Sequence, residues 1–411
     1  MSETRVTAIA ACRSCDSAAL ASVFDMGDMP ASDGFLRARD ARDPHYPLEV
    51  VMCEACGLVQ LRHTVAPEVL FSDDYVYLSS FTQTVVDNAR ANLDEAIARF
   101  SPPKDGLIVE LASNDGYLLK QAMARGYKVL GIDPAKGPVE AARKAGVETV
   151  QAFFGEALAR KLAAEGRKAD ILFGSNVLAH VAGTADFVRG IKTMLKPGGT
   201  AIIEAPYLRE LIDHNEFDTI YHEHLCYFSA TALKTLFARQ GLTLFDVKRI
   251  PIHGGSLRMF IAHEAPESPA LTKLIADEKR DGLDKPAAFR AFADRVDAIG
   301  RKLRTLLQTL RKDGKRVAGY GAAAKGTILL NHFGIGRDLL DWVADKNVHK
   351  QGLFVPGVGL EIVSPDRIES DKPDYLVILP WNHKDEIMRQ QAAHAARGGK
   401  FIVPIPDPKI V

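Results

Sequence analysis

Residues 106–117 read GLIVELASNDGY, and this stretch indicates the fold of the central part of the chain. Gly106 to Leu111 form a short apolar run, as expected for a strand buried inside a parallel sheet. Ser113 to Gly116 form a polar turn, and Leu118 to Ala124 have helical character. A buried strand, a turn and a helix in this order predict the first unit of an α/β sheet.

The same alternation continues on the C-terminal side of this stretch. We expect a turn at Lys196–Gly199, helices over 138–145 and 184–195, and strands over 127–133, 169–174 and 200–204. Strands and helices that alternate at this pitch predict a doubly wound α/β sheet.

A second α/β pattern follows in the C-terminal third. Residues 265–310 predict long linking helices, because apolar residues recur at helical spacing: Phe289, Phe292, Val296, Ile299, Leu303 and Leu307. We then expect a helix that reaches Asn331 and strands over 315–321, 339–345, 375–379 and 401–404. This order predicts a second Rossmann-like α/β domain.

Four of the five cysteines form two CxxC pairs, Cys12 with Cys15 and Cys53 with Cys56. Four thiolates on two tight turns complete a tetrahedral Zn²⁺ shell, which organises a domain and does no chemistry. The loop over 16–52 shows little periodicity, so we expect this small lobe to need the metal as a staple. Two pairs of buried or redox-active cysteines are the alternative.

A helix is expected between this lobe and the central module. Within residues 68–100, apolar and small residues recur at helical spacing, and the pattern stops at Ser101-Pro102-Pro103. We therefore divide the chain into a zinc-binding lobe over 1–80, a central domain over 81–265, and linking helices with a C-terminal domain over 266–411.

Composition excludes several classes of protein. The 411 residues correspond to about two or three domains. The 52 basic and 52 acidic side chains cancel, which argues against binding to nucleic acid or to an anionic membrane surface. No apolar run approaches the ~20 residues of a membrane span, and the N-terminus does not read as a signal peptide. We expect a soluble, cytoplasmic protein that is a monomer or a small homo-oligomer.

The loop after the first central strand carries acidic and polar groups where a nucleotide would bind. It lacks the GxGxxG pattern of pyrophosphate binding, and Glu110 and Asp133 each stand at a strand end, where ligands of open α/β sheets lie. Carboxylates there favour a cationic, hydroxyl-bearing ligand without phosphate, and S-adenosylmethionine fits that description. The arrangement, with its Lys196–Gly199 turn, resembles the class I methyltransferase fold. The candidate cofactor-binding residues are Glu110, Ser113, Asn114, Asp115, Gly116, Asp133 and Asn176.

Residues 221–229, YHEHLCYFS, are dense in titratable groups. A metal site is disfavoured by the spacing of the two histidines, because HExxH would need the second His two places further on. Acid/base chemistry suits the cluster better, with His near neutral pKa and Glu or Tyr beside it. His180, after the strand that ends at Gly174, is expected to face the same cleft. The alternative is an aromatic, polar helix start capped by Ser229.

Several motifs in order resemble the sugar C-methyltransferases that act on nucleotide-linked 4-keto-6-deoxyhexoses, typified by the dTDP-sugar C-3 enzymes. They are the two CxxC pairs, ELASNDGY, Asn176 to His180, YHEHLCYFS, His253 to Arg258, and Gly319 to Gly326. The resemblance implies an enolate formed beside the ketone and methyl transfer to carbon, without a catalytic metal. It implies His224 as base, Tyr221 as alternative base or reprotonating acid, and Glu223 as the group that orients them. It also implies that Tyr75 and His180 hold the sugar or its ketone.

The C-terminal module is expected to hold the nucleotide part of the substrate. Its GYGAAAKG turn, 319–326, follows a strand and opens a helix, so its N–H groups could bind a pyrophosphate, although it matches neither a P-loop nor a clean GxGxxG. A small-residue packing turn is the alternative. The candidate substrate-binding residues are Tyr77, His253, Gly321, Ala323, Lys325 and Lys346.

Two other functions remain open from the sequence alone. An NAD-dependent dehydrogenase or epimerase of nucleotide sugars would use the C-terminal glycine-rich turn, and a zinc-ribbon adaptor or nucleic-acid binder would use the cysteine lobe. The sequence does not distinguish dTDP, GDP or CDP as the nucleotide, nor does it fix the methylated carbon or the substituent at C3.

Overall fold

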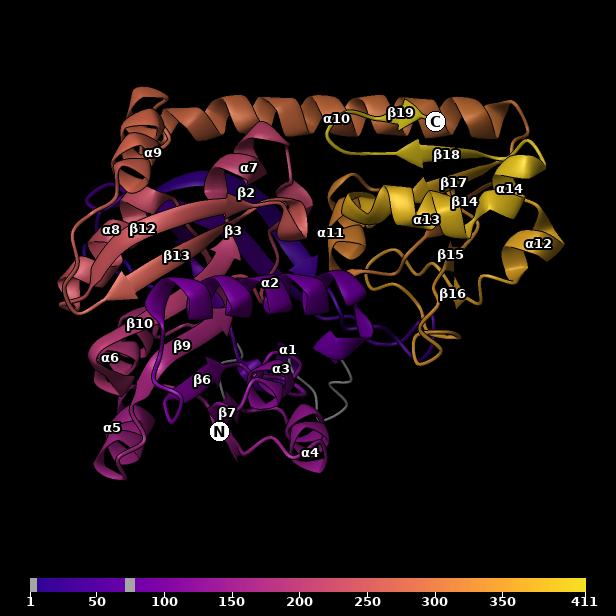
Figure 1. Ribbon diagram of the computed structural model, residues 1–411. Coiled ribbons are helices and arrows are strands. Elements are labelled where there is room, and N and C mark those ends of the chain that lie inside the picture. Colours follow the sequence, from indigo (N-terminus) through magenta and orange to yellow (C-terminus); the bar gives the residue numbers. More distant parts are fainter. Residues whose placement is uncertain (1–5, 71–77) are drawn as a thin grey trace.

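The computed structural model describes residues 6–70 and 78–411, which form three larger sheets and one two-stranded sheet, joined by helices (Figure 1). Tyr75 and Tyr77, both predicted to contact the substrate, lie outside the described residues. Among the described residues, every helix is too short or too polar to cross a membrane.

The central sheet has seven strands in the order β12-β13-β10-β9-β6-β7-β8. Their bounds are β6 Leu107–Leu111, β7 Lys128–Asp133, β8 Thr149–Gln151, β9 Ala169–Ser175, β10 Leu195–Pro206, β12 Thr243–Ile250 and β13 Ser256–Ala262. All are parallel except β13, which runs antiparallel to both of its neighbours. Numbered along the chain, the order is 3-2-1-4-5-7-6, the arrangement of the class I methyltransferase fold that the sequence predicts.

Helices cover both faces of this sheet. They are α2 Gln83–Phe100, α3 Leu119–Ala124, α4 Lys136–Lys144, α5 Glu156–Ala164, α6 Thr184–Met194, α7 Leu208–Asp213 and α8 Ala230–Arg239, with short 3₁₀ turns η1 Ser79–Phe81, η2 Leu178–His180, η3 Phe217–Thr219 and η4 Ile252–Gly254. The sequence analysis did not predict β8, β12, β13, α5 or α7. The turn expected at Lys196–Gly199 is instead an irregular part of β10, where the pairing shifts between Leu195 and Thr200.

The C-terminal domain begins with α9 Pro269–Arg280 and the 26-residue α10 Ala287–Lys312, which runs along one side of the molecule (Figure 1). Its sheet has the order β16-β15-β14-β17-β18-β19, parallel except for β19. The remaining bounds are β14 Val317–Tyr320, β15 Val343–Ala344, β16 Ile362–Val363, β17 Tyr375–Ile378, β18 Lys400–Val403, β19 Lys409–Ile410, α11 Ala324–His332, α12 Arg367–Asp371, η5 Trp381–His383, α13 Lys384–Gln390 and α14 Ala392–Ala396. The first five strands follow the Rossmann order 3-2-1-4-5.

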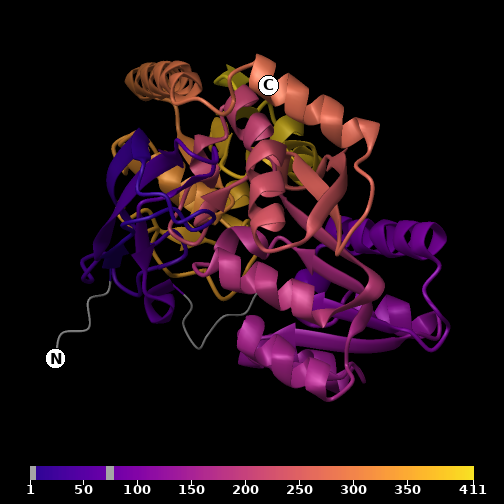
Figure 2. The same cartoon turned by 90° about the vertical axis from the view of Figure 1, so that its left-hand side faces the viewer.

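The N-terminal lobe contains a four-stranded antiparallel sheet, β11-β4-β3-β2, which lies beside the central domain (Figure 2). Its strands are β2 Leu20–Pro30, β3 His45–Cys53, β4 Val59–Leu61 and β11 Cys226–Tyr227. Outside it lie β1 Val6–Ala8, paired with β5 His63–Val65, and α1 Pro67–Leu70. The expectation of a loop over 16–52 is therefore wrong, because Tyr46, Leu48, Val50 and Met52 alternate inward along β3.

A single hydrophobic core connects the three parts of the chain. The six apolar residues predicted to lie along one face of α10 are all buried. One of them, Phe292, meets Phe24 of β2 with ring centroids 5.4 Å apart and at an angle of 67°. Aromatic rings in this edge-to-face arrangement add to the energy of burial. The N-terminal lobe is therefore fixed to the C-terminal domain by apolar packing.

Replacement of Phe292 by Ala tests this packing. The side chain is 0% exposed, and removing a fully buried Phe costs about 3–5 kcal/mol of unfolding free energy. Urea unfolding should show this loss for Phe292→Ala, whereas Phe153→Ala, at a side chain 74% exposed, should change stability little. Equal effects of the two substitutions would contradict the shared core.

Candidate functional site

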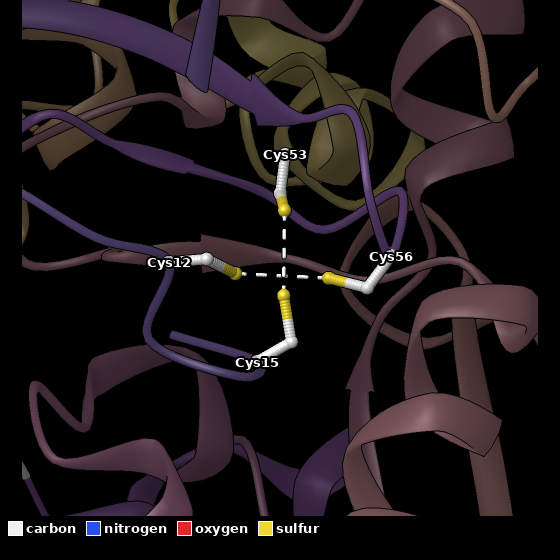
Figure 3. A group of neighbouring side chains, drawn as sticks. All are labelled: Cys12, Cys15, Cys53 and Cys56. Atoms are coloured by element: carbon white, nitrogen blue, oxygen red, sulfur yellow. Dashed lines mark hydrogen bonds between the residues drawn. The ribbon is translucent and has the colours of Figure 1, made fainter. Parts of the chain in front are cut away.

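The four paired cysteines come together, as the sequence predicts (Figure 3). Cys12 Sγ lies 3.6 Å from Cys56 Sγ, and Cys15 Sγ lies 3.5 Å from Cys53 Sγ. All four sulfurs lie within 4.8 Å of one another. A tetrahedral zinc site with Zn–S bonds of about 2.3 Å needs sulfurs about 3.8 Å apart, so this donor set fits Zn²⁺. The site provides four thiolates and no open position for a substrate.

Each CxxC pair lies on a tight turn, a zinc knuckle. The first knuckle, at Cys12 and Cys15, supports β4, the strand that pairs with the segment after His224. In the first knuckle, the backbone N–H of Arg13 donates to Gln60 Oε1 (3.0 Å), and the Arg13 guanidinium donates to the Leu61 carbonyl (2.6 Å). Gln60 lies in β4 and is paired with Cys226 of β11. The metal lobe thus holds the segment that directly follows His224.

The predicted cofactor residues gather at the carboxyl edge of the central sheet. The Asn114 N–H donates to Asp133 Oδ2 (2.9 Å), which joins the turn after β6 to the end of β7. The Asn114 Oδ1 accepts from the Ser79 N–H (2.8 Å), so η1 lies against the same turn. Ala112, Asn114 and Asn176 have positive φ angles of 52°, 49° and 53°. Non-glycine residues in this region cluster at functional sites.

Glu110 gives the clearest sign that this edge suits a cation. Both of its carboxylate oxygens are buried, and among the described residues the Tyr117 side chain is the hydrogen-bonding group that acts on them, without forming a hydrogen bond of good geometry. Burial, with Asp133 and Asp115 nearby, raises the pKa of Glu110 well above its usual range. A cationic ligand would offset that repulsion and favour the ionised carboxylate. The residues present therefore fit a cationic ligand such as S-adenosylmethionine.

The loop over residues 221–229 lies at the same edge of the sheet. The Leu225 N–H donates to the Ala179 carbonyl (2.7 Å) in η2, the turn that follows β9. His180, the last residue of η2, meets His224 with ring centroids 4.7 Å apart. The structure thus brings together the two predicted segments, 176–180 and 221–229.

The imidazole of His224 is held at both nitrogens. Its Nδ1 lies 2.8 Å from the Thr219 carbonyl, and its Nε2 lies 2.9 Å from the Tyr221 hydroxyl. A carbonyl oxygen accepts only, so Nδ1 carries the proton, and Nε2 of the neutral ring accepts from Tyr221. In this arrangement Nε2 of His224 can accept a proton from the Tyr221 hydroxyl, which contacts it directly.

The orienting role predicted for Glu223 falls to Thr219 instead. Glu223 faces Ser32, Asp33 and Lys350, and burial raises its pKa to about 8. Since a backbone carbonyl has no sequence signature, the contact between Thr219 and His224 could not be predicted from residue types. The other histidine of the cluster, His222, is buried against the Tyr46 carbonyl (3.1 Å).

The glycine-rich turn of the C-terminal domain is less open to a pyrophosphate than expected. The N–H groups of Gly321, Ala322 and Ala323 already donate to the Ala344 carbonyl, the Asp345 carboxylate and the Gly321 carbonyl. Gly321 has φ +89°, and a Cβ there would lie 2.4 Å from the Pro380 side chain. These contacts favour the alternative prediction for the first half of the turn, in which its small residues pack tightly and bind no phosphate.

The remaining predicted substrate residues lie around this turn or outside what is described. Lys346 is exposed just after β15. For His253 only the backbone, in η4, is described. The Lys325 ammonium lies 4.5 Å from the centre of the Trp381 ring.

Lys325 also faces two buried carboxyl groups of the central domain. Burial raises the pKa of Glu216 to about 8 and the pKa of Asp218 to about 6, and the charge of Lys325 lowers both. Asp218 accepts a hydrogen bond from Trp381 Nε1 (2.8 Å). Glu216, Asp218 and Trp381 were not predicted, because contacts between positions more than 160 residues apart leave no local pattern.

Comparison with known proteins agrees with this architecture. Family models match residues 12–71 ("Putative zinc binding domain"), 86–247 ("Methyltransferase domain") and 251–406 ("C-methyltransferase C-terminal domain"). The C-methyltransferase NovU of Streptomyces niveus is 35% identical over 405 residues, which cover 97% of this chain and 96% of that protein. This chain belongs to the C-methyltransferase family. It is an S-adenosylmethionine-dependent enzyme with a cysteine-rich zinc lobe.

Two more distant similarities cover less than half of this chain. A ubiquinone biosynthesis O-methyltransferase of Chelativorans sp. (strain BNC1) is 35% identical over 107 residues, 26% of this chain and 42% of that protein. The crystal structure of an S-adenosylmethionine dependent methyltransferase from Mesorhizobium loti has 15% identity and a TM-score of 0.34, covering 43% of this chain and 99% of that one. The fold assignment rests on the strand order and the family models.

Zinc content tests the cysteine cluster. The purified C-methyltransferase should contain about one zinc ion per chain, because four converging thiolates form one closed shell. Cys56→Ser should lose the metal and lower the unfolding temperature. Cys226→Ser, at the fifth cysteine outside the cluster, should keep it. Metal analysis that finds zinc retained in Cys56→Ser would overturn the assignment.

The pH dependence of stability tests the buried Glu216. Burial raises the folded-state pKa of Glu216 to about 8, above its usual value of 4.5, so the folded state binds more protons between those values. Stability contributed by this group should therefore fall as pH rises from about 5 to 8. Glu216→Gln should flatten that fall in urea unfolding experiments. The exposed Glu264→Gln should not, and an unchanged slope in Glu216→Gln would contradict the pKa shift.

Proposed function

We propose that this C-methyltransferase acts on a nucleotide-linked 4-keto-6-deoxy sugar and methylates the carbon next to the ketone, at C3. The observation that carries the proposal is the Tyr221–His224 pair, with its proton-accepting Nε2 fixed at the carboxyl edge of the methyltransferase sheet. A carbon atom becomes a nucleophile for methylation only after it loses a proton, and a neighbouring ketone makes that proton acidic. A base next to the cofactor edge is what this reaction needs.

The geometry supports proton removal through Tyr221 with His224 as the base. The phenol proton moves to His224 Nε2 while the Tyr221 oxygen takes the proton from the sugar carbon. The electron pair of the broken C–H bond stays on the sugar as an enolate. The bound cofactor supplies an electrophilic methyl group. Direct removal by His224 would require Tyr221 to move away from Nε2.

The imidazolium formed on His224 is stabilised by its fixed partner. Its Nδ1–H keeps donating to the Thr219 carbonyl while Nε2–H holds the transferred proton near Tyr221. His180, packed on His224 at the other side of the loop, is proposed to donate to the ketone oxygen as it gains charge. Loss of one such donor costs about 3 kcal/mol of barrier.

The other site residues keep proposed roles. Glu110, Ser113 to Gly116, Asp133 and Asn176 hold the cofactor, and Tyr75 holds the sugar. The nucleotide part is proposed to lie on the C-terminal domain over 266–411, near the start of α11. Two first-turn donors of that helix, the N–H groups of Ala324 and Lys325, remain for a phosphate oxygen after the bonds described above.

Turnover with defined substrates tests the proposal. The enzyme, S-adenosylmethionine and a dTDP-, GDP- or CDP-linked 4-keto-6-deoxy sugar should give a product heavier by one methylene, measured by mass spectrometry. His224→Asn and Tyr221→Phe should each lower kcat at least 100-fold, while calorimetry should find unchanged binding of S-adenosylhomocysteine.

A second histidine provides the matched control. His263 Nε2 also contacts a backbone carbonyl, that of Leu195 (3.3 Å). Leu195 begins β10, so this contact lies at the opposite edge of the sheet from the loop over 221–229. His263→Asn should therefore keep its turnover within about twofold of wild type. A His224→Asn enzyme with near-normal kcat would refute the role of His224. Absence of a methylated product with every keto sugar would refute the proposed substrate class.

A further inference from the structure

The ring of His224 depends on a turn of the neighbouring chain segment. The Thr219 carbonyl that accepts from Nδ1 belongs to η3, a single 3₁₀ turn. The turn is closed by two backbone hydrogen bonds, from the Thr219 N–H to Glu216 and from the Ile220 N–H to Phe217. The Thr219 hydroxyl adds one more bond within the turn, to the Glu216 carbonyl (2.7 Å). The direction of the Thr219 carbonyl then also depends on the contacts that hold this short turn from outside.

Two side chains of this turn reach the C-terminal domain. The Phe217 ring packs on Phe333, with centroids 4.8 Å apart. Asp218, which is 0% exposed, accepts from Trp381 Nε1 (2.8 Å) with its Oδ2. Trp381 begins η5, directly beyond the carboxyl end of β17. The residue next to Thr219 is thus fixed by a long-range bond between two domains.

The hydrogen bond between Asp218 and Trp381 is sensitive to substitution, because the Asp218 carboxylate is buried. Asp218 Oδ1 is buried with no partner among the described residues, so the indole N–H is the side-chain donor to this carboxylate. Lys325, over the Trp381 ring, is the cation that acts on both Asp218 and Glu216. A buried carboxylate that loses its donor is strongly penalised and tends to move or take up a proton.

We propose that Asp218 and Trp381 are positioning residues for the catalytic base: their hydrogen bond holds the Thr219 carbonyl against His224 Nδ1. The bond fixes the tautomer of His224, so that Nε2 stays available to accept the Tyr221 proton. The C-terminal domain therefore contributes to the readiness of the base as well as to substrate binding. This inference rests on the proposed role of His224.

The chain contains a matched control for Trp381. Its only other tryptophan, Trp342, is also buried in the C-terminal domain and also donates from Nε1 to a carboxylate, Asp371 (3.1 Å). Trp342 packs in a separate apolar cluster with Ala318 and Ile368. Trp→Phe at either position removes one indole N–H and a similar volume, but only Trp381 contacts η3.

The experiment measures the tautomer of His224 directly, by ¹⁵N NMR of the full chain with labelled histidine. His224→Asn identifies its signals among the 12 histidines. Wild type and Trp342→Phe should show one Nδ1-protonated ring. Trp381→Phe should show a mixture of tautomers, with kcat lowered about tenfold or more and the KM for S-adenosylmethionine unchanged. A Trp381→Phe spectrum and kcat equal to those of Trp342→Phe would overturn the proposal.

Two substitutions at Asp218 separate positioning from general destabilisation. Asp218→Asn keeps an oxygen that accepts from the Trp381 indole and should retain the single tautomer. Asp218→Leu has similar volume without an acceptor and should behave as Trp381→Phe. Equal tautomer populations in both variants would also refute the inference. The NMR measurement needs no sugar substrate, so failure of methyl transfer to every keto sugar would count against the proposed function alone.

Discussion

The position of His224 depends on the two backbone hydrogen bonds of the next residue, Leu225. Its N–H donates to the Ala179 carbonyl of the central domain, and its carbonyl accepts from the Leu61 N–H of the zinc lobe. One residue between two domains thus fixes His224, which directly precedes it. β4 and β11 continue this pairing, and Arg13 of the first zinc knuckle donates a hydrogen bond to the Leu61 carbonyl of β4. A metal site without an open position can therefore help to position His224, the proposed base.

The arrangement explains why the three parts of the chain form one unit. A class I methyltransferase sheet supplies a cofactor edge, but its strand ends alone do not provide a base at a fixed distance from that edge. In this protein the proposed base, His224, lies on a loop whose two sides contact different domains: β4 of the zinc lobe on one side, and Trp381 of the C-terminal domain, through η3, on the other. Rigid elements on both sides hold a catalytic group more precisely than a free loop would.

The sequence predicted the architecture well because the relevant signals are local. Apolar strands followed by polar turns gave four of the seven central strands in order, namely β6, β7, β9 and β10, and the CxxC spacing gave the metal ligands. The loop expected over 16–52 was wrong: Tyr46, Leu48 and Val50 alternate with Pro47 and Glu49 along β3, but a proline within such a run argues against a strand when only the sequence is considered. The short β8 lacks an apolar run of strand length, which explains its omission.

The details of the candidate site were harder to predict because they arise from contacts between distant positions. YHEHLCYFS contains both members of the Tyr221–His224 pair, yet residue types suggested Glu223 as the orienting group, and the structure uses a backbone carbonyl. In the same way, the glycine-rich turn at 319–326 suggested open N–H donors, but Asp345 from the next strand end occupies one of them. Sequence patterns indicate which groups reach an edge of a sheet. Which of them remain available there depends on hydrogen bonds that neighbouring strands and domains already use.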